Sequence, residues 1–118
     1  MEHKAVEEYV LSMPNARLDY PFGEDVAVYK VYPKGVSPDA GGRGSMFALI
    51  PEKSKPLRLS LKCDPLLAEK LREKYVTVMP GYHLNKKHWN TIVLTGEMPW
   101  EEVQDLIKHS YQLVAGTK

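Results

Sequence analysis

The stretch from Pro80 to Asn90 differs in its chemistry from the rest of the chain. Its eleven residues include two histidines, two lysines, two asparagines, a tyrosine and a tryptophan, but no acidic residue. Side chains of these kinds can bind a polyanion, because cations contact phosphates and aromatic rings stack on bases. Residues 91–95, which follow directly, have the composition of a strand, so the stretch is predicted to be a loop that leads into a strand.

The middle of the chain is basic and both ends are acidic. Residues 26–95 hold twelve Lys and Arg against five acids, a net charge of +7, while residues 1–25 carry −4 and residues 96–118 carry −2. One group of cations, upstream of the loop, consists of Lys53, Lys55, Arg58 and Lys62. This distribution predicts a surface for nucleic-acid phosphates, with DNA as the candidate partner. The candidate contact residues are Arg58, Lys62, Tyr82, His83, Asn85, Lys86, Lys87 and His88.

A pocket for a small anionic ligand or a peptide is the alternative use of this region. Its walls would be formed by Tyr20, Phe22, His83, Asn85 and Trp89. Such a site is concave with aromatic walls, whereas a nucleic-acid site is an extended basic face. A structural role for the loop is a third interpretation, because Trp89 precedes a strand and favours a core position. Asn85 and His88 also suit hydrogen bonds to the local backbone.

Catalysis and metal binding have little support in the sequence. Cys63 falls on the apolar side of its expected strand, which favours a buried thiol over a nucleophile. Ser60 would need His83 or His88 beside it, and the chain has no Gly-x-Ser-x-Gly turn. The four histidines show no metal-ligand spacing. We therefore predict a non-enzymatic protein with no metal site and no cofactor.

Length and composition indicate one globular domain. The chain has 118 residues, 43% of them hydrophobic and 26% charged, and we expect residues 1–118 to share one core. Cys63 is the single cysteine, so an internal disulfide is excluded. The sequence has no apolar run near the roughly 20 residues that span a bilayer, and its acidic start lacks a signal core. We expect a cytoplasmic monomer that does not enter a membrane.

Three helices are expected from apolar stripes at three- and four-residue steps. The first covers residues 3–13, with a stripe formed by Ala5, Val6, Tyr9, Val10 and Met13. The second follows Asp64, which suits an N-cap, and Pro65, which suits the first helical position. Its solvated side is expected to carry Lys70, Arg72, Glu73 and Lys74. The third begins at Pro99, and its inward stripe is formed by Val103, Leu106, Ile107, Ser110, Tyr111 and Val114.

The expected strands are residues 26–32, 46–50, 57–63 and 91–95, and residues 76–78 also favour an extended backbone. The segment 17–23 is expected to be an edge strand that ends in a turn. The segment 57–63 alternates without exception, with Leu57, Leu59, Leu61 and Cys63 on one side and Arg58, Ser60 and Lys62 on the other. This alternation predicts a sheet with one packed face and one wet face. Residues 33–45 hold four glycines and are expected to be a loop, and Gly41–Gly44 does not match a phosphate-binding loop.

These elements predict an α+β protein in which an antiparallel sheet packs against helices. The expected order is α-β-β-β-(β)-α-β-α. Short turns between consecutive strands favour antiparallel pairing. The helices are expected on the apolar face of the sheet, because each element must bury its hydrophobic side against another.

The segment GYHLNKKHWN at residues 81–90, followed by TIVLTGEMP and later LIKHSYQLV, resembles the MmcQ/YjbR family of small bacterial proteins. Upstream segments agree in order, and the resemblance covers nearly the whole chain: Pro14–Ala16, Tyr20–Gly23, Met46–Leu49 and Leu59–Pro65. Carried over by position, the motif residues are His83, Leu84, Asn85, Lys86, His88, Trp89 and Asn90. The loop at residues 33–45 departs from the family pattern in its length.

The resemblance implies a double-wing, frataxin-like fold and, by analogy of fold, DNA binding. Analogy of fold is a weak guide to function, because one fold hosts many activities. An iron-handling role like that of frataxin would need an exposed acidic ridge, and the first helix carries few acids. The resemblance implies no catalytic residues.

Overall fold

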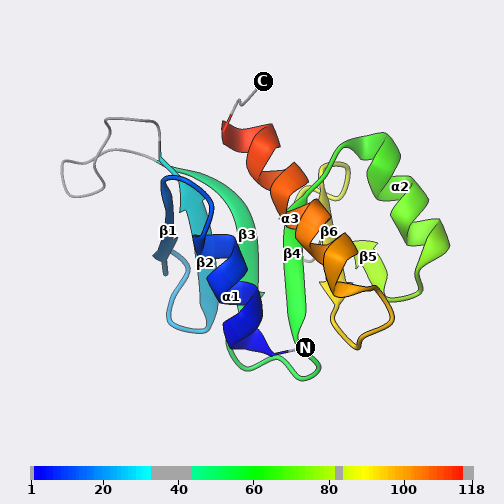
Figure 1. The fold of residues 1–118 in the computed structure, drawn as a ribbon, viewed down its shortest axis with the longest axis horizontal. Helices are drawn as coiled ribbons and strands as arrows, with labels where there is room; N and C mark the ends of the chain where they lie inside the picture. Colours follow the sequence, from blue (N-terminus) through cyan, green and yellow to red (C-terminus); the bar gives the residue numbers. More distant parts are fainter. Residues whose placement is uncertain (1, 33–43, 82–83, 116–118) are drawn as a thin grey trace.

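A computed structural model describes residues 2–32, 44–81 and 84–115 of the chain (Figure 1). In these residues three helices and six strands form an α+β fold, which confirms the expected fold class. In chain order they are α1 (His3–Leu11), β1 (Ala16–Asp19), β2 (Val26–Val31), β3 (Ser45–Pro51), β4 (Arg58–Lys62), α2 (Pro65–Lys74), β5 (Val78–Pro80), β6 (Trp89–Val93) and α3 (Trp100–Ala115). In the described part of the chain, none of the helices is long and apolar enough to cross a membrane.

The six strands form one sheet in the order β1-β2-β3-β4-β6-β5, and every neighbouring pair is antiparallel. The expected element order counted one strand between the second and third helices, and this was wrong. The short edge strand β5 also lies there and pairs with β6, matching Val78 with Ile92. β6 begins at Trp89, two residues before the expected start, because Trp89 already pairs with Lys62 of β4.

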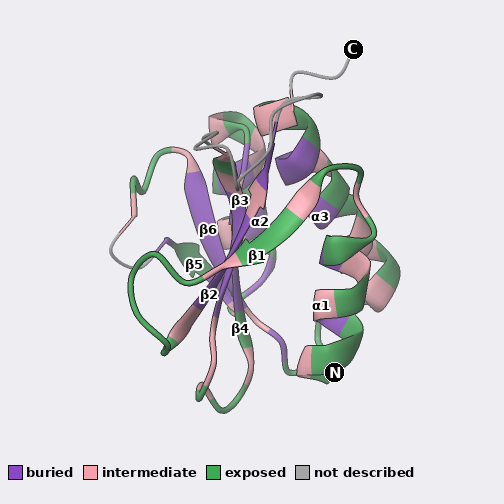
Figure 2. Cartoon of the chain, turned by 90° about the vertical axis from the view of Figure 1, so that its left-hand side faces the viewer, coloured by how far each residue is buried: buried purple, intermediate pink, exposed green. Residues whose placement is uncertain are grey.

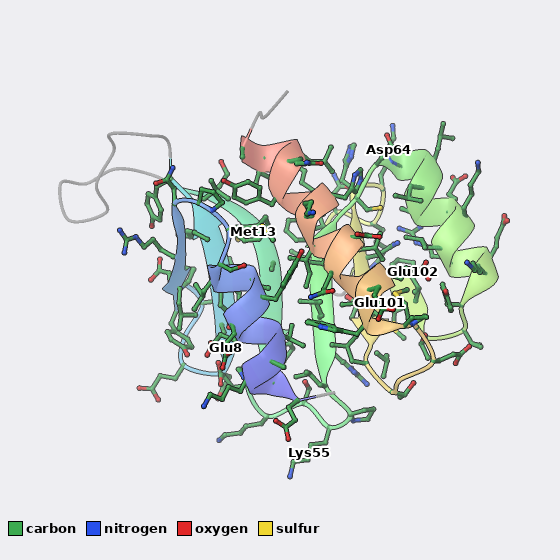
Figure 3. All side chains as sticks on the ribbon, viewed as in Figure 1. Glu8, Met13, Lys55, Asp64, Glu101 and Glu102 are labelled. Atoms are coloured by element: carbon green, nitrogen blue, oxygen red, sulfur yellow. The ribbon has the colours of Figure 1, made fainter. Side chains whose placement is uncertain are left out.

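The helix boundaries follow from local signals. The Asp64 carboxylate accepts the backbone N–H groups of Leu66 and Leu67 at 3.2 and 3.3 Å, which confirms the predicted cap of α2 (Figure 3). Glu101 and Glu102 occupy the first turn of α3, where the helix dipole favours negative charge (Figure 3). α1 ends at Leu11, earlier than predicted, so Met13 packs against the core from outside the helix.

All three helices pack on one side of the sheet, which Figure 2 shows nearly edge-on. The predicted stripe of α3 is confirmed, with Ser110 and Tyr111 buried beside its aliphatic residues. On α1 only Val6 and Val10 are buried, and the predicted Ala5 is exposed. The strands contribute large, fully buried side chains to this covered face: Tyr29, Phe47, Ile50, Leu59 and Ile92.

Among the described residues, no helix covers the opposite face, and we call it the open face (Figure 2). Its central row can be followed through the pairing of the strands, because directly paired residues share a face. The row runs Asp19, Val28, Leu49, Ser60, Thr91, Met79 from β1 to β5. Residues 33–43 of the predicted loop, and with them most of Gly41–Gly44, lie outside the described residues.

The contact between β3 and β4 is short. It comprises the pairs Ala48–Leu61 and Leu49–Ser60, and the next position is occupied by a side chain of α3. There the Ser110 hydroxyl accepts the Lys62 N–H at 2.9 Å and donates to the Phe47 carbonyl at 2.6 Å. A helix side chain is thus inserted between two strands where a direct backbone hydrogen bond would otherwise form.

Candidate binding site on the open face

A groove of about 700 Å³ lies on the open face. It extends from the start of β2 to β5 and the loop that follows β5. Its lining is mainly apolar, with two cations and two hydroxyl groups: Phe22, Val26, Leu49, Pro51, Arg58, Ser60, Met79, Pro80, Leu84, Lys86 and Thr91. A small cluster of buried side chains, Val28, Leu49 and Trp89, supports the groove from the sheet.

The groove has a polar pair at its centre. The hydroxyl groups of Ser60 and Thr91 lie 2.8 Å apart and are hydrogen-bonded. Ser60 is only 7% exposed and Thr91 only 4% exposed, although both belong to the face expected to be wet. That expectation was wrong at this position, because the short Ser60 side chain lies low between Leu49 and Thr91, its neighbours on adjacent strands.

The charge around the groove is positive. Arg58 and Lys86 line it with exposed side chains, and none of its described lining residues is acidic. Asp19 lies on the same face but is paired with Lys30, with Nζ and Oδ2 3.1 Å apart. The hydrogen bond from Lys30 lowers the pKa of the Asp19 carboxyl group. The charge of Asp19 is therefore already balanced by Lys30, whereas Arg58 and Lys86 of the groove are exposed.

One wall of the groove is the loop between β5 and β6, which is held by close backbone contacts. The Gly81 N–H donates to the Trp89 carbonyl at 2.9 Å. A Cβ atom at Gly81 would lie 2.7 Å from the Cβ of Trp89, so a larger residue does not fit without a shift. The Asn85 side-chain oxygen accepts the Lys87 N–H at 2.9 Å, and the Asn85 carbonyl accepts two further backbone N–H groups.

Arg72 of α2 forms hydrogen bonds to this wall of the groove, and the sequence did not predict this contact. It was assigned to the solvated side of the helix, and this was wrong. Its guanidinium donates to the Asn90 side-chain oxygen at 2.7 Å and to the backbone carbonyls of Lys86 and Trp89. The signal that could have revealed it is position: Arg72 lies one turn after the buried Ala68, on the same side of the helix.

The comparisons with known proteins agree with this fold. A YjbR family model matches residues 11–113 of the chain. The chain belongs to the YjbR family. Uncharacterised protein YbdF of Escherichia coli O157:H7 is 30% identical over 112 residues, which span 95% of this chain and 83% of YbdF.

A second relative matches over a shorter stretch, and two solved structures match nearly the whole chain. Uncharacterised protein YjbR of Escherichia coli K12 is 42% identical over 67 residues, and this match spans 57% of each of the two chains. Among solved structures, the DUF419 protein DR2400 of Deinococcus radiodurans superimposes with a TM-score of 0.84 at 36% identity, covering 98% of this chain and 80% of DR2400. A Pseudomonas syringae protein gives 0.75 at 27% identity, covering 97% and 99%.

The YjbR-family motif divides between structural and solvent-facing roles. Trp89 is 7% exposed and Asn90 2% exposed, and both pack into the sheet. The His88 side chain is half-buried, and its carbonyl accepts the Cys63 N–H at 2.7 Å. Lys86 and Lys87 are exposed, and of the two only Lys86 lines the groove. Tyr82 and His83 lie outside the described residues.

The remaining candidates lie partly in and partly outside the groove. Phe22 lines it with 64% of its surface exposed. Tyr20 does not line it, and its hydroxyl donates to Glu52 at 3.1 Å. Lys62 is half-buried on the open face beside Trp89. The upstream cations Lys53 and Lys55 lie in the β3–β4 turn, outside the groove. Lys55 is labelled in Figure 3.

The thiol of Cys63 is unsuited to nucleophilic chemistry. Cys63 is buried on the covered face, as predicted from its strand. Burial, followed by the charge of Asp64, raises the pKa of the thiol to about 11. Few thiolates form near neutral pH at such a pKa. Within residues 2–32, 44–81 and 84–115, the structure has no group of three or more His, Cys, Asp or Glu side chains that could hold a metal ion.

Proposed function

We propose that this YjbR-family protein is a non-enzymatic binding module and that the groove on the open face binds an anionic ligand. One observation carries the proposal. An apolar concavity of about 700 Å³ is bordered by Arg58 and Lys86, and none of its described lining residues is acidic. Opposite charge in the ligand would complement this border.

The size and lining of the groove support a small ligand. Ligand sites are typically concave, of roughly 300–1,000 Å³, with mostly apolar walls and a few polar groups. Phe22 and Met79 line the groove, and 64% and 37% of their surfaces are exposed to solvent. Covering them with a ligand would remove apolar surface from water, which favours binding.

An NMR titration with 8-anilinonaphthalene-1-sulfonate, an anionic aromatic dye, tests the proposed site. We expect saturable shifts of the backbone amides of Leu49 and Thr91. The double variant Arg58→Gln/Lys86→Gln should weaken binding about tenfold or more, because it removes both groove cations. The control Lys70→Gln/Lys108→Gln removes two exposed cations of α2 and α3. Equal dye affinity in both double variants would refute the proposed site.

Nucleic acid is the second candidate ligand, and the cations outside the groove favour it. Lys87 continues the positive surface along the β5–β6 loop, and Lys62 adds charge to the open face. Contacts of Lys and Arg with phosphates release counterions, so nucleic-acid binding weakens steeply as salt rises.

Fluorescence-anisotropy titrations of duplex and single-stranded DNA at two salt concentrations test this candidate. We expect salt-sensitive binding that Lys86→Ala/Lys87→Ala abolishes. A folded wild-type protein that does not bind DNA at low salt would eliminate it. Phe22→Ser separates the two candidates, because Phe22 carries no charge for a phosphate but lines the groove.

A further inference from the structure

The groove on the open face runs across the strands. Its lining residues come from the neighbouring strands β2, β3, β4, β6 and β5, for example Val26 at one end and Met79 at the other. Neighbouring strands lie about 4.8 Å apart, so four spacings give a groove roughly 19 Å long. This length suits an elongated molecule better than a compact ion.

Apolar side chains occur along the whole of this length. Phe22, Val26 and Pro51 line the part near the start of β2, Leu49 lies at the centre, and Met79 and Leu84 line the far part. In the centre the hydroxyls of Ser60 and Thr91 are hydrogen-bonded to each other. An aliphatic chain can cross them without separating this pair, whereas a ligand with strong polar groups at its middle would have to compete with it.

The two cations of the groove differ in what they can still bind. Lys86 lies on the β5–β6 loop, and its Nζ already donates to the Gly81 carbonyl at 3.3 Å. Arg58 belongs to β4, and its side chain is exposed. A guanidinium presents a planar fork that holds a carboxylate by two parallel hydrogen bonds. Arg58 is therefore the better partner for one carboxylate, with Lys86 adding positive potential.

We infer that the groove binds an elongated amphipathic carboxylate of the fatty-acid type. This inference rests on the proposed binding function of the groove and specifies its ligand. The carboxylate pairs with Arg58 on β4, the middle strand of the groove, and the alkyl chain covers the apolar lining from there toward the start of β2, formed by Phe22, Val26 and Pro51. The absence of acidic groups from the described lining matches a ligand with one negative end and no positive one.

Calorimetric titration of the full-length protein with dodecanoate, below its micellar concentration, tests the inference. We expect one site, and Arg58→Gln should weaken binding about tenfold, since a charged hydrogen-bonded pair is lost. Arg17→Gln is the matched control, because Arg17 is exposed on β1 and does not line the groove. The inference is wrong if the two variants bind dodecanoate equally well.

The alkyl chain is tested with ligands of different length and charge. Dodecanoate, decanoate and octanoate should differ by about fourfold for every two methylene groups, since an open groove buries about half of each group. Phe22→Ser should weaken dodecanoate binding several-fold, while Leu66→Ser, which changes an exposed leucine of α2, should not. Dodecyltrimethylammonium has the same chain and opposite charge, and binding as tight as that of dodecanoate would overturn the inference.

The experiments also distinguish the inference from the proposed function. Dye binding that depends on Arg58 and Lys86, together with no dodecanoate binding, would leave the groove as a site and reject the fatty-acid class. Failure of both the dye and dodecanoate would reject both. A concentration-dependent dimer that Phe22→Ser dissociates would assign the groove to a second copy of the chain and overturn the inference.

Discussion

The polar groups on the two faces of the sheet differ in their bonding partners. On the covered face the Tyr29 hydroxyl donates to Glu7 at 2.6 Å, and Ser110 bridges two backbone groups. On the open face Arg58 and Lys86 border a groove with no acid among its described lining residues. Beneath the helices the polar groups bond to the protein itself. On the open face Ser60 and Thr91 also bond to each other, whereas the side chain of Arg58 is exposed, and our proposal assigns it to a ligand.

The faces also differ in how completely they are packed. Phe47 and Ile50 of β3 are fully buried beneath the helices, while Met79 on the open face keeps 37% of its surface exposed. Substitutions on the covered face should therefore change mainly stability. Substitutions on the open face should change mainly binding.

The largest expected effect is that of Phe47→Ala on the covered face. Phe47 packs edge-to-face on Tyr111 with ring centroids 5.6 Å apart, and its loss leaves a cavity. We expect the free energy of unfolding to fall by about 4 kcal/mol, measured by urea denaturation. Met79→Ala on the open face is the control, with an expected loss below about 1 kcal/mol. Similar losses in the two variants would abolish the contrast between the faces.

Ser110→Ala should have the next largest effect. It removes the hydroxyl that joins the Lys62 N–H to the Phe47 carbonyl and leaves both groups without that partner. We expect a loss of about 2 kcal/mol in the free energy of unfolding. Ser110→Thr, which keeps the hydroxyl, should recover part of that loss. An alanine variant as stable as the wild type would mean that water replaces the hydroxyl at no cost.

Arg72→Met tests the connection between the two faces. Arg72 reaches from α2 on the covered side to the loop that forms a wall of the groove. We expect a loss of about 1.5 kcal/mol and faster amide hydrogen exchange in residues 85–90. Arg72→Lys should not restore slow exchange, because one ammonium group cannot reproduce the fork. Unchanged exchange in the methionine variant would show that the loop holds its own position.

The smallest expected effect is that of Asp19→Asn on the open face. The pKa of Asp19 is lowered in the folded protein, so its ion pair with Lys30 stabilises the fold above the unfolded-state value near 3.8. This contribution is lost as the pH falls through the lower folded value. Asp19 is half-exposed, so we expect only about 0.3 kcal/mol at neutral pH. Denaturation between pH 2 and 7 should show a slightly flatter acid limb for the variant.

Short-range signals explain what could be predicted from the sequence. Asp64 and Pro65 fixed the start of α2, because a cap and a preset φ angle act within one turn. The stripe of α3 identified Ile107 and Tyr111 as buried, because helical periodicity sets which side faces the sheet. The α+β class followed from the sum of such local patterns.

Long-range contacts explain what could not be predicted. The composition of residues 76–78 indicated an extended backbone, but no local pattern revealed that the three residues of β5 pair with β6. Arg72 has the composition of a surface residue, and its role depends on where a loop fourteen or more residues away returns. The burial of Ser60 on the face expected to be wet likewise depends on its neighbours on two other strands.

The Ser110 bridge has a mechanical consequence. The bridge lies at the boundary between two halves of the sheet, β1–β2–β3 and β4–β6–β5. In the described residues, the strands of the two halves pair through the short β3–β4 ladder. The groove crosses this boundary, because Leu49 belongs to one half of the sheet and Thr91 to the other. A ligand in the groove would contact both halves of the sheet on the face opposite Ser110 of α3. We expect an occupied groove to stiffen the β3–β4 boundary without displacing α3.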